Sequence, residues 1–118
     1  MQFSVAELLE RNLLAVFGER DSTRRQAALE TLWSPQGVFI DPDGQYVGID
    51  AIGRRVDELQ ARFPGFVFVA RGSANAMHEV GRLAWGFGPE VDNAAVTGTD
   101  VAVTRNGKLL ALYAFIDS

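Results

Sequence analysis

The sequence predicts an α+β fold in which helices come first and an antiparallel sheet follows. Apolar residues recur at helical spacing up to residue 63, whereas strand-like segments fill the chain from residue 66 onward. An Asn-Gly pair at 106–107 separates the last two strand-like segments and is a strong hairpin signal. A length of 118 residues suits a single domain. We therefore expect one core between helices and sheet.

The first helix is expected from about 5 to 18. Ser4 and Glu7 form a capping box before an apolar stripe that continues to Gly18. Asn12 interrupts this stripe. A polar side chain at this position either reaches solvent at the edge of the stripe or needs a partner or a wet cavity.

Two further helices are expected. One runs from Thr23 to Trp33 behind the cap Asp21, and Ser34-Pro35 stops it. The other runs from about 49 to 63 and ends at Pro64-Gly65. Its expected buried face consists of Ile52, Val56, Leu59 and Phe63.

The strands are expected in two groups. A short hairpin joins 37–41 to 45–48 through a turn at 42–44. After residue 65, strands are expected at 66–71, 77–87, 94–104 and 108–117. The last three form an antiparallel meander, with Asn106-Gly107 in a type I′ turn that needs positive φ at both positions.

Composition limits the function classes. A net charge of −4, from 11 Lys and Arg against 15 Asp and Glu, predicts no nucleic-acid partner. No apolar run is long enough to span a membrane, and the acidic N-terminal stretch is unlike a signal peptide, so we expect a cytoplasmic protein. No cysteine is present, GxGxxG is absent, and His78 is the sole histidine. We therefore expect no cofactor and no metal site.

The final strand carries apolar residues on both of its faces. Residues 109–116 read LLALYAFI, so both alternating sets are apolar. Helices can cover one face of the sheet. The other needs either a long loop, for which the sequence offers no segment, or a second copy in an isologous homodimer, which we favour.

Several segments together resemble a known superfamily. They are VFIDPDGQYVGIDAI (38–52), FPGF (63–66), TGTD (97–100) and NGKLLALYAFID (106–117). With the element order, they resemble the nuclear transport factor 2-like superfamily, closest to its polyketide cyclase (SnoaL-like) and ketosteroid isomerase branches. The resemblance covers nearly the whole chain and implies a single domain, 1–118, whose curved sheet forms a cone-shaped pocket closed by the helices. It also implies that dimers through the open sheet face are common, and that fold is better specified than reaction.

Asp100 is the leading candidate site residue. If it points into the pocket, strand alternation turns Val96, Gly98 and Ala102 inward with it. Burial there would raise its pKa and suit it to acid/base chemistry, or to donating a hydrogen bond when protonated. The resemblance implies the same two roles, in the cyclases and the isomerases respectively, and places Leu83, Trp85 and Phe87 inward. The alternative is a structural Asp satisfied by Thr99, Asn12, a backbone amide or a helix arginine.

Other candidates are weaker. Asp41 matches the general base of the isomerases by resemblance, but Asp41-Pro42-Asp43-Gly44 also fits a type I turn. Asn12 lies near the position where those isomerases carry a tyrosine, which argues against steroid isomerisation. His78 is either a surface residue at a strand end or a pocket residue beside Asp100. Candidate pocket walls, equally expected as plain core, are Trp33, Tyr46, Phe63, Trp85 and Phe87.

These expectations leave two function classes. The first is a domain that binds a small hydrophobic molecule, with Asp100 and Asp41 as candidate acid/base residues of a cofactor-independent isomerase, cyclase or dehydratase. The second is a non-catalytic ligand-binding or dimerisation module.

Overall fold

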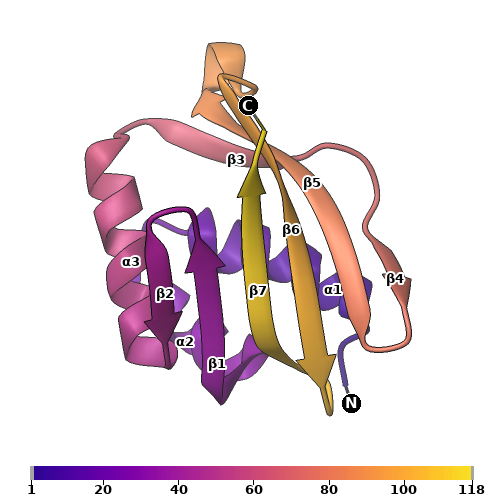
Figure 1. Cartoon of the computed structure of the whole chain (residues 1–118). Helices are drawn as coiled ribbons and strands as arrows, with labels where there is room; N and C mark the ends of the chain where they lie inside the picture. Colours follow the sequence, from indigo (N-terminus) through magenta and orange to yellow (C-terminus); the bar gives the residue numbers. More distant parts are fainter. Residues whose placement is uncertain (1, 118) are drawn as a thin grey trace.

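The computed structural model describes residues 2–117 and confirms the α+β class. Helices lie on one side of a mixed, mostly antiparallel sheet, and the other side of the sheet faces outward (Figure 1). The helical elements are α1 (Val5–Arg11), η1 (Asn12–Phe17), α2 (Ser22–Leu32), α3 (Ile49–Arg62) and the short η2 (Glu90–Asp92). The strands are β1 (Trp33–Asp41), β2 (Gly44–Val47), β3 (Phe66–Ala70), β4 (Asn75–Met77), β5 (Val80–Pro89), β6 (Val96–Arg105) and β7 (Lys108–Ile116).

The first helical segment begins as the sequence predicts. The Ser4 side chain accepts a hydrogen bond from the Glu7 backbone, and the Glu7 side chain accepts one from the Ser4 backbone. From Asn12 onward the segment is a π-helix, closed by a hydrogen bond from the backbone N–H of Gly18 to the carbonyl of Leu13 at 2.9 Å. The sequence gives no sign of this wider turn, a kind that often occurs at functional sites.

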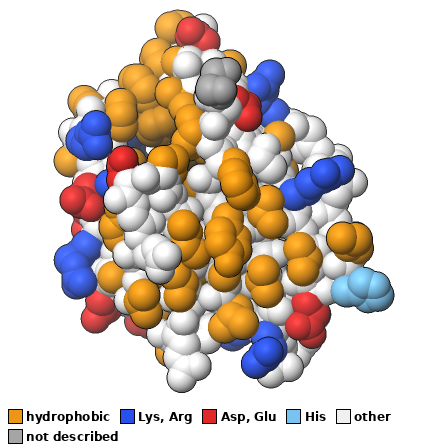
Figure 2. Space-filling model, in the orientation of Figure 1, with side chains coloured by type: hydrophobic (Ala, Val, Ile, Leu, Met, Phe, Trp, Pro, Cys, Tyr) orange, Lys and Arg blue, Asp and Glu red, His pale blue; other side chains and the backbone are white. Residues whose placement is uncertain are grey.

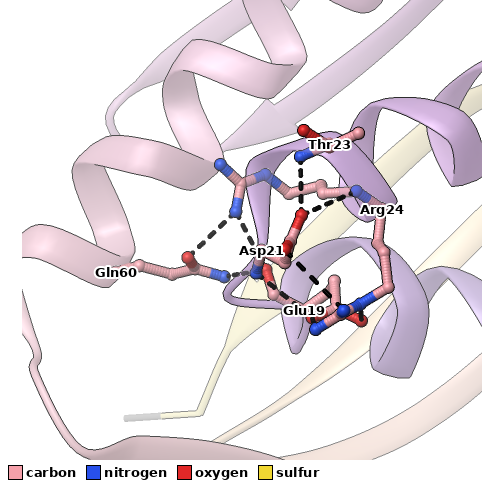
Figure 3. A network of polar contacts seen from close by, with 6 residues as sticks. Glu19, Asp21, Thr23, Arg24 and Gln60 are labelled. Carbon is pink, nitrogen blue, oxygen red and sulfur yellow. Dashed lines mark hydrogen bonds and ion pairs between the residues drawn. The ribbon is translucent and has the colours of Figure 1, made fainter.

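The second helix ends one residue earlier than predicted, because Trp33 already has extended backbone and begins β1. Asp21 caps this helix as expected, accepting hydrogen bonds from the backbone N–H groups of Thr23 and Arg24 (Figure 3). Strand β1 is longer than the predicted 37–41 because the chain stays extended through Ser34-Pro35. Helix α3 follows its predicted course.

A polar network joins the start of α2 to α3 (Figure 3). Arg25 is only 3% exposed and donates hydrogen bonds to the Gln60 side chain, the Glu19 carbonyl and the Asp57 carboxylate. Gln60 in turn donates to the carbonyls of Phe17 and Glu19. These contacts fix α3 against the C-terminal end of η1, at Phe17.

The sheet has the order β2-β1-β7-β6-β5-β3, with β4 paired to β5. Strands β5, β6 and β7 form the predicted antiparallel meander, whereas β1 runs parallel to β7. Asn106 and Gly107 have φ values of 53° and 74°, which confirms the predicted turn. The predicted strand 77–87 is wrong at its start: His78, with φ of 55°, lies in a turn between β4 and β5.

The core lies between the helices and the inner face of the sheet. Its buried side chains come from α1, η1, α2 and α3 and from β1, β5, β6 and β7. The largest fully buried ones are Leu8, Leu9, Leu13, Leu29, Trp33, Ile52, Leu83, Leu109 and Leu112. Among residues 2–117, no helix is long and apolar enough to cross a membrane.

Candidate functional site

A cavity of about 420 Å³ opens between the inner face of the sheet, η1 and α3. This volume lies toward the lower end of the range for small-molecule sites. Its wall is mostly apolar and aromatic, while its polar side chains are few. The lining residues are Leu13, Phe17, Phe39, Asp41, Pro42, Asp43, Arg55, Leu59, Arg62, Phe63, Phe68, Trp85, Phe87, Val96, Asp100, Ala114 and Ile116.

Asp100 has the predicted orientation. Along β6, Gly98, Asp100 and Ala102 are buried, whereas Val101 and Val103 on the other face are only half-buried. Asp100 is 5% exposed and lines the cavity. It therefore places a carboxyl group in a largely apolar wall.

The hydrogen-bond partner of Asp100 is Trp85, which was not among the partners expected for a structural Asp. The indole Nε1 donates to Oδ1 of Asp100 at 2.9 Å. The other oxygen, Oδ2, accepts no hydrogen bond from the described residues. It is not fully buried either, because Asn12 Nδ2 is the only side-chain polar atom of residues 2–117 that is both fully buried and without a partner. Oδ2 is therefore open to the cavity, where a ligand can reach it.

Burial raises the pKa of Asp100 and the hydrogen bond from Trp85 offsets a smaller part of this rise, so that the resulting pKa is about 7. The apolar surroundings disfavour the charged form, whereas the indole N–H favours it. With this pKa, protonated and ionised Asp100 are both populated near neutral pH. The group can therefore give or take a proton there.

Asp41 is engaged through both of its oxygens. Oδ1 accepts from the backbone N–H groups of Asp43 and Gly44, which stabilises the predicted turn. Oδ2 accepts from Nε of Arg55 at 2.8 Å, and this arginine also pairs with Asp43 at 2.9 Å. These contacts favour the turn interpretation over a free base.

The sheet register brings the two candidate carboxyl groups to the same cavity. Ile40 pairs with Tyr113 and Ala114 pairs with Asp100, so Asp41, one residue beyond Ile40, lies level with Ala114 on the neighbouring strand. Two strand spacings then separate the Cα atoms of Asp41 and Asp100 by about 10 Å. The small side chain of Ala114 lies between them.

Arg55 is a cavity residue that the sequence analysis missed, although a signal was available. It lies three residues after Ile52 and four before Leu59, so it shares the apolar face of α3. A cation on such a face needs an acidic partner. The Asp41-Pro42-Asp43 turn supplies it.

The remaining candidates divide between the cavity and other places. Phe63, Trp85 and Phe87 line the cavity. The other four candidates, Asn12, Trp33, Tyr46 and His78, do not line the cavity. Trp33 and Asn12 are buried in the core and joined by a hydrogen bond of 2.9 Å from the indole Nε1 to Oδ1.

Two candidates lie near the surface instead. Tyr46, on β2, stacks on Phe39 and lies under the Arg55 guanidinium without lining the cavity. His78 lies in an exposed turn and does not line the cavity, because the chain reverses there instead of starting a long strand. No three His, Asp or Glu side chains of the described residues are arranged to hold a metal ion.

Comparison with known proteins finds likeness in structure only. No family model matches the chain, and no curated protein matches it in sequence. A candidate isomerase of the SnoaL-like family from Agrobacterium tumefaciens superposes with a TM-score of 0.87 at 24% identity, over 94% of this chain and 95% of the other. The protein has the nuclear transport factor 2-like fold.

Two further structures with this fold are similar. A candidate SnoaL-like polyketide cyclase from Jannaschia superposes with a TM-score of 0.79 at 12% identity, over 96% of this chain and 85% of the other. A protein of ketosteroid isomerase-like fold from Catenulispora acidiphila, in complex with trimethylamine, superposes with a TM-score of 0.75 at 13% identity, over 95% of this chain and 86% of the other. At these identities the likeness extends to the nuclear transport factor 2-like fold alone.

Proposed function

We propose that the protein binds a small, largely apolar organic molecule in this cavity and holds its carbonyl or hydroxyl oxygen at Asp100. The observation that carries the proposal is the free Oδ2 of Asp100, which faces an aromatic-walled cavity of about 420 Å³. An apolar wall supplies affinity through burial, and one polar group fixes orientation. The trimethylamine complex of one structural neighbour supports the use of this fold for small ligands.

The reaction that fits this site best is a cofactor-independent proton transfer by Asp100. Isomerisation, aldol-type cyclisation and dehydration all need a proton taken from or given to carbon or oxygen, and an acid with a pKa of about 7 can do both near neutral pH. Asp41 is held by Arg55 and the turn, so we assign it a structural role at the cavity rim. The similarity to candidate isomerases and cyclases supports this reaction class.

Proton exchange tests the proposal without knowledge of the natural substrate. The protein is incubated in D₂O with a panel of cyclic ketones and lactones, and ¹H NMR follows the loss of the C–H signals next to the carbonyl. We expect exchange with at least one compound for the wild type and none above background for Asp100→Asn. Asp50→Asn, which changes an exposed carboxylate on α3 outside the cavity, is the matched control and should exchange normally.

Binding is measured on the same panel by thermal shift and calorimetry. Ligand binding that survives in Asp100→Asn, without exchange in either protein, would support the second candidate, a non-catalytic ligand-binding module. Failure of every compound to bind would contradict the proposal itself.

We also propose that the outer sheet face binds a second copy of the chain in a homodimer. Figure 2 shows hydrophobic side chains gathered across this face, over the strands labelled in Figure 1. Tyr113 is 40% exposed and Phe115 is 59% exposed, and their outward neighbours Ile40, Val101 and Val103 continue the apolar surface across β1 and β6. A contiguous apolar patch rimmed by polar residues is typical of an interface, and two copies cover it symmetrically.

Light scattering at micromolar concentration tests the dimer. We expect twice the monomer mass of 12.9 kDa for the wild type and the monomer mass for Phe115→Glu. Leu14→Glu adds the same charge at an exposed apolar residue of η1, on the helical side of the sheet, and should remain dimeric. A monomeric wild type would contradict the interface.

A further inference from the structure

Trp85 and Asp100 form a diagonal contact across neighbouring strands. Trp85 pairs with Gly98, and Asp100 pairs with Leu83, so the tryptophan and the aspartate lie two residues out of register on the inner face. Diagonal neighbours are close enough for a long aromatic side chain to reach across. The indole N–H and Oδ1 lie 2.9 Å apart, inside the core.

Gly98 makes this contact possible. A Cβ atom at this position would lie 2.4 Å from Cζ2 and 2.8 Å from Cη2 of Trp85, and 2.4 Å from the backbone carbonyl oxygen of Phe115, closer than packed atoms approach. The indole therefore lies directly over the glycine and extends along β6 toward Asp100. Phe68 packs edge-on against the same ring, with 5.6 Å between the ring centroids, and this contact limits the movement of the indole.

The chemistry of the indole decides how Asp100 carries its proton. An indole Nε1–H can donate a hydrogen bond and cannot accept one, so the oxygen facing it must act as the acceptor. Oδ1 is that oxygen. The C=O oxygen of a carboxylic acid accepts a hydrogen bond more strongly than its O–H oxygen. The indole therefore favours Oδ1 as the C=O oxygen of protonated Asp100 and places the proton on Oδ2, the oxygen that is open to the cavity.

We propose that Trp85 is a positioning residue that keeps the acidic proton of Asp100 on Oδ2, facing the ligand, and that Gly98 provides the space for it. The inference rests on the proposed function, in which Asp100 exchanges a proton with the ligand. In the forward step the Oδ2–H bond breaks and the proton passes to a ligand oxygen or carbon. The carboxylate left behind keeps its hydrogen bond from Trp85, and the reverse step restores Oδ2–H.

The first test titrates Asp100 in the free full-length protein by ¹³C NMR of labelled aspartate carboxyl carbons, with Asp100→Asn identifying the resonance. We expect the wild-type midpoint at about pH 7. In Trp85→Phe the midpoint should rise by about one pH unit, because a hydrogen bond that favours the carboxylate is lost. Trp33→Phe makes the same change at an indole bound to Asn12 and should leave the midpoint in place. An equal midpoint in wild type and Trp85→Phe would overturn the proposal.

The second test locates the proton by infrared spectroscopy below pH 6. In the wild type, Oδ1 is the C=O oxygen and accepts from the indole, so the carboxyl C=O band of Asp100 should lie at lower frequency than in Trp85→Phe. If that variant does not fold, as judged by circular dichroism, Trp85→Leu also removes the indole N–H and should raise the band in the same way. A band unchanged by removal of the indole would contradict the assignment.

Neither measurement uses a ligand. A protein that catalyses no proton exchange but shows both shifts would refute the proposed proton transfer and leave the positioning role intact. Proton exchange without a shift in either the titration midpoint or the carboxyl band would support the proton transfer and refute the positioning role of Trp85. Once a substrate is found, the pH profile of turnover in Trp85→Phe should move upward with the titration midpoint.

Discussion

Arg55 donates its Nε–H to Oδ2 of Asp41 at 2.8 Å, and neither side chain is more than 8% exposed. This pair holds the β1–β2 turn against α3 at the rim of the cavity. We therefore propose a structural role for Asp41, in place of the general base that the resemblance implied.

Replacement of Asp41 by Asn should therefore lower the free energy of unfolding and leave turnover largely unchanged. The amide oxygen can still accept the turn hydrogen bonds, but Arg55 loses its buried charged partner, which should lower the free energy of unfolding by about 1.5–3 kcal/mol. Asp43→Asn removes the more exposed partner of the same arginine and should cost less than about 1 kcal/mol. Urea denaturation measures both. Unchanged stability together with lost turnover in Asp41→Asn would instead show a chemical role.

Asp100 should make stability fall as pH rises. Its folded-state pKa is about 7, above that of the unfolded chain, so the folded protein binds more protons between about pH 4 and pH 7. The contribution of Asp100 to stability is therefore fully present below about pH 4 and is lost at about 1.4 kcal/mol per pH unit up to about pH 7. Urea denaturation from pH 4 to 8 should show this loss in the wild type and not in Asp100→Asn. Parallel pH dependences in the two proteins would contradict it.

The buried Asn12–Trp33 hydrogen bond should show coupling in a double-mutant cycle. Asn12→Leu leaves the Trp33 N–H without a partner in the core, and Trp33→Phe leaves the Asn12 amide oxygen without one. Each orphaned group costs about 1–3 kcal/mol, whereas removal of both partners leaves none unpaired. The double variant should thus be more stable than the sum of the single effects, by about 0.5–3 kcal/mol. Additive effects in urea denaturation would argue against a formed bond.

Two neighbouring arginines should differ sharply in their effect on stability. Arg20 donates to the carbonyls of Gln60, Phe63 and Phe66, which closes the C-terminal end of α3. Arg20→Ala should cost about 1 kcal/mol or more, because the carbonyls of Gln60, Phe63 and Phe66 all lose the hydrogen bond from this guanidinium.

Arg24 provides the comparison. Its side chain is 70% exposed and, within residues 2–117, pairs only with Glu19 and Asp21, so Arg24→Ala should cost less than about 1 kcal/mol. Thermal denaturation of the two variants measures the difference. An equal loss in both would show that the Arg20 contacts do not hold the helix end.

Local patterns predicted most of the fold. The capping box at Ser4, the turn at Asn106-Gly107 and the alternation around Asp100 each depend on residues a few positions apart, and the structure contains all three. The error at His78 has a local cause, because a residue with positive φ turns the chain where the pattern continues as a strand. The homodimer remains a prediction.

The contacts of the site were harder to predict because they join distant segments. The Trp85–Asp100 hydrogen bond joins residues 15 apart in the sequence and depends on the register between β5 and β6. The Arg55–Asp41 pair depends on how α3 lies over the first hairpin. Alternation could place Asp100 on the inner face, but it could not say which side chain would meet it. The partnership of Asn12 with Trp33 likewise needed the packing of η1 on β1.

The position of β7 in the sheet has a consequence for folding. It follows all other strands in the chain, yet it lies between β1 and β6 and carries Ala114, the residue between the two carboxyl groups of the cavity. Before β7 is added, β1 and β2 have no connection to the rest of the sheet, so pairing across some 70 residues must precede closure of the cavity. Any ligand of Asp100 therefore meets its binding site only after the chain has folded through its last strand, and its binding should report complete folding.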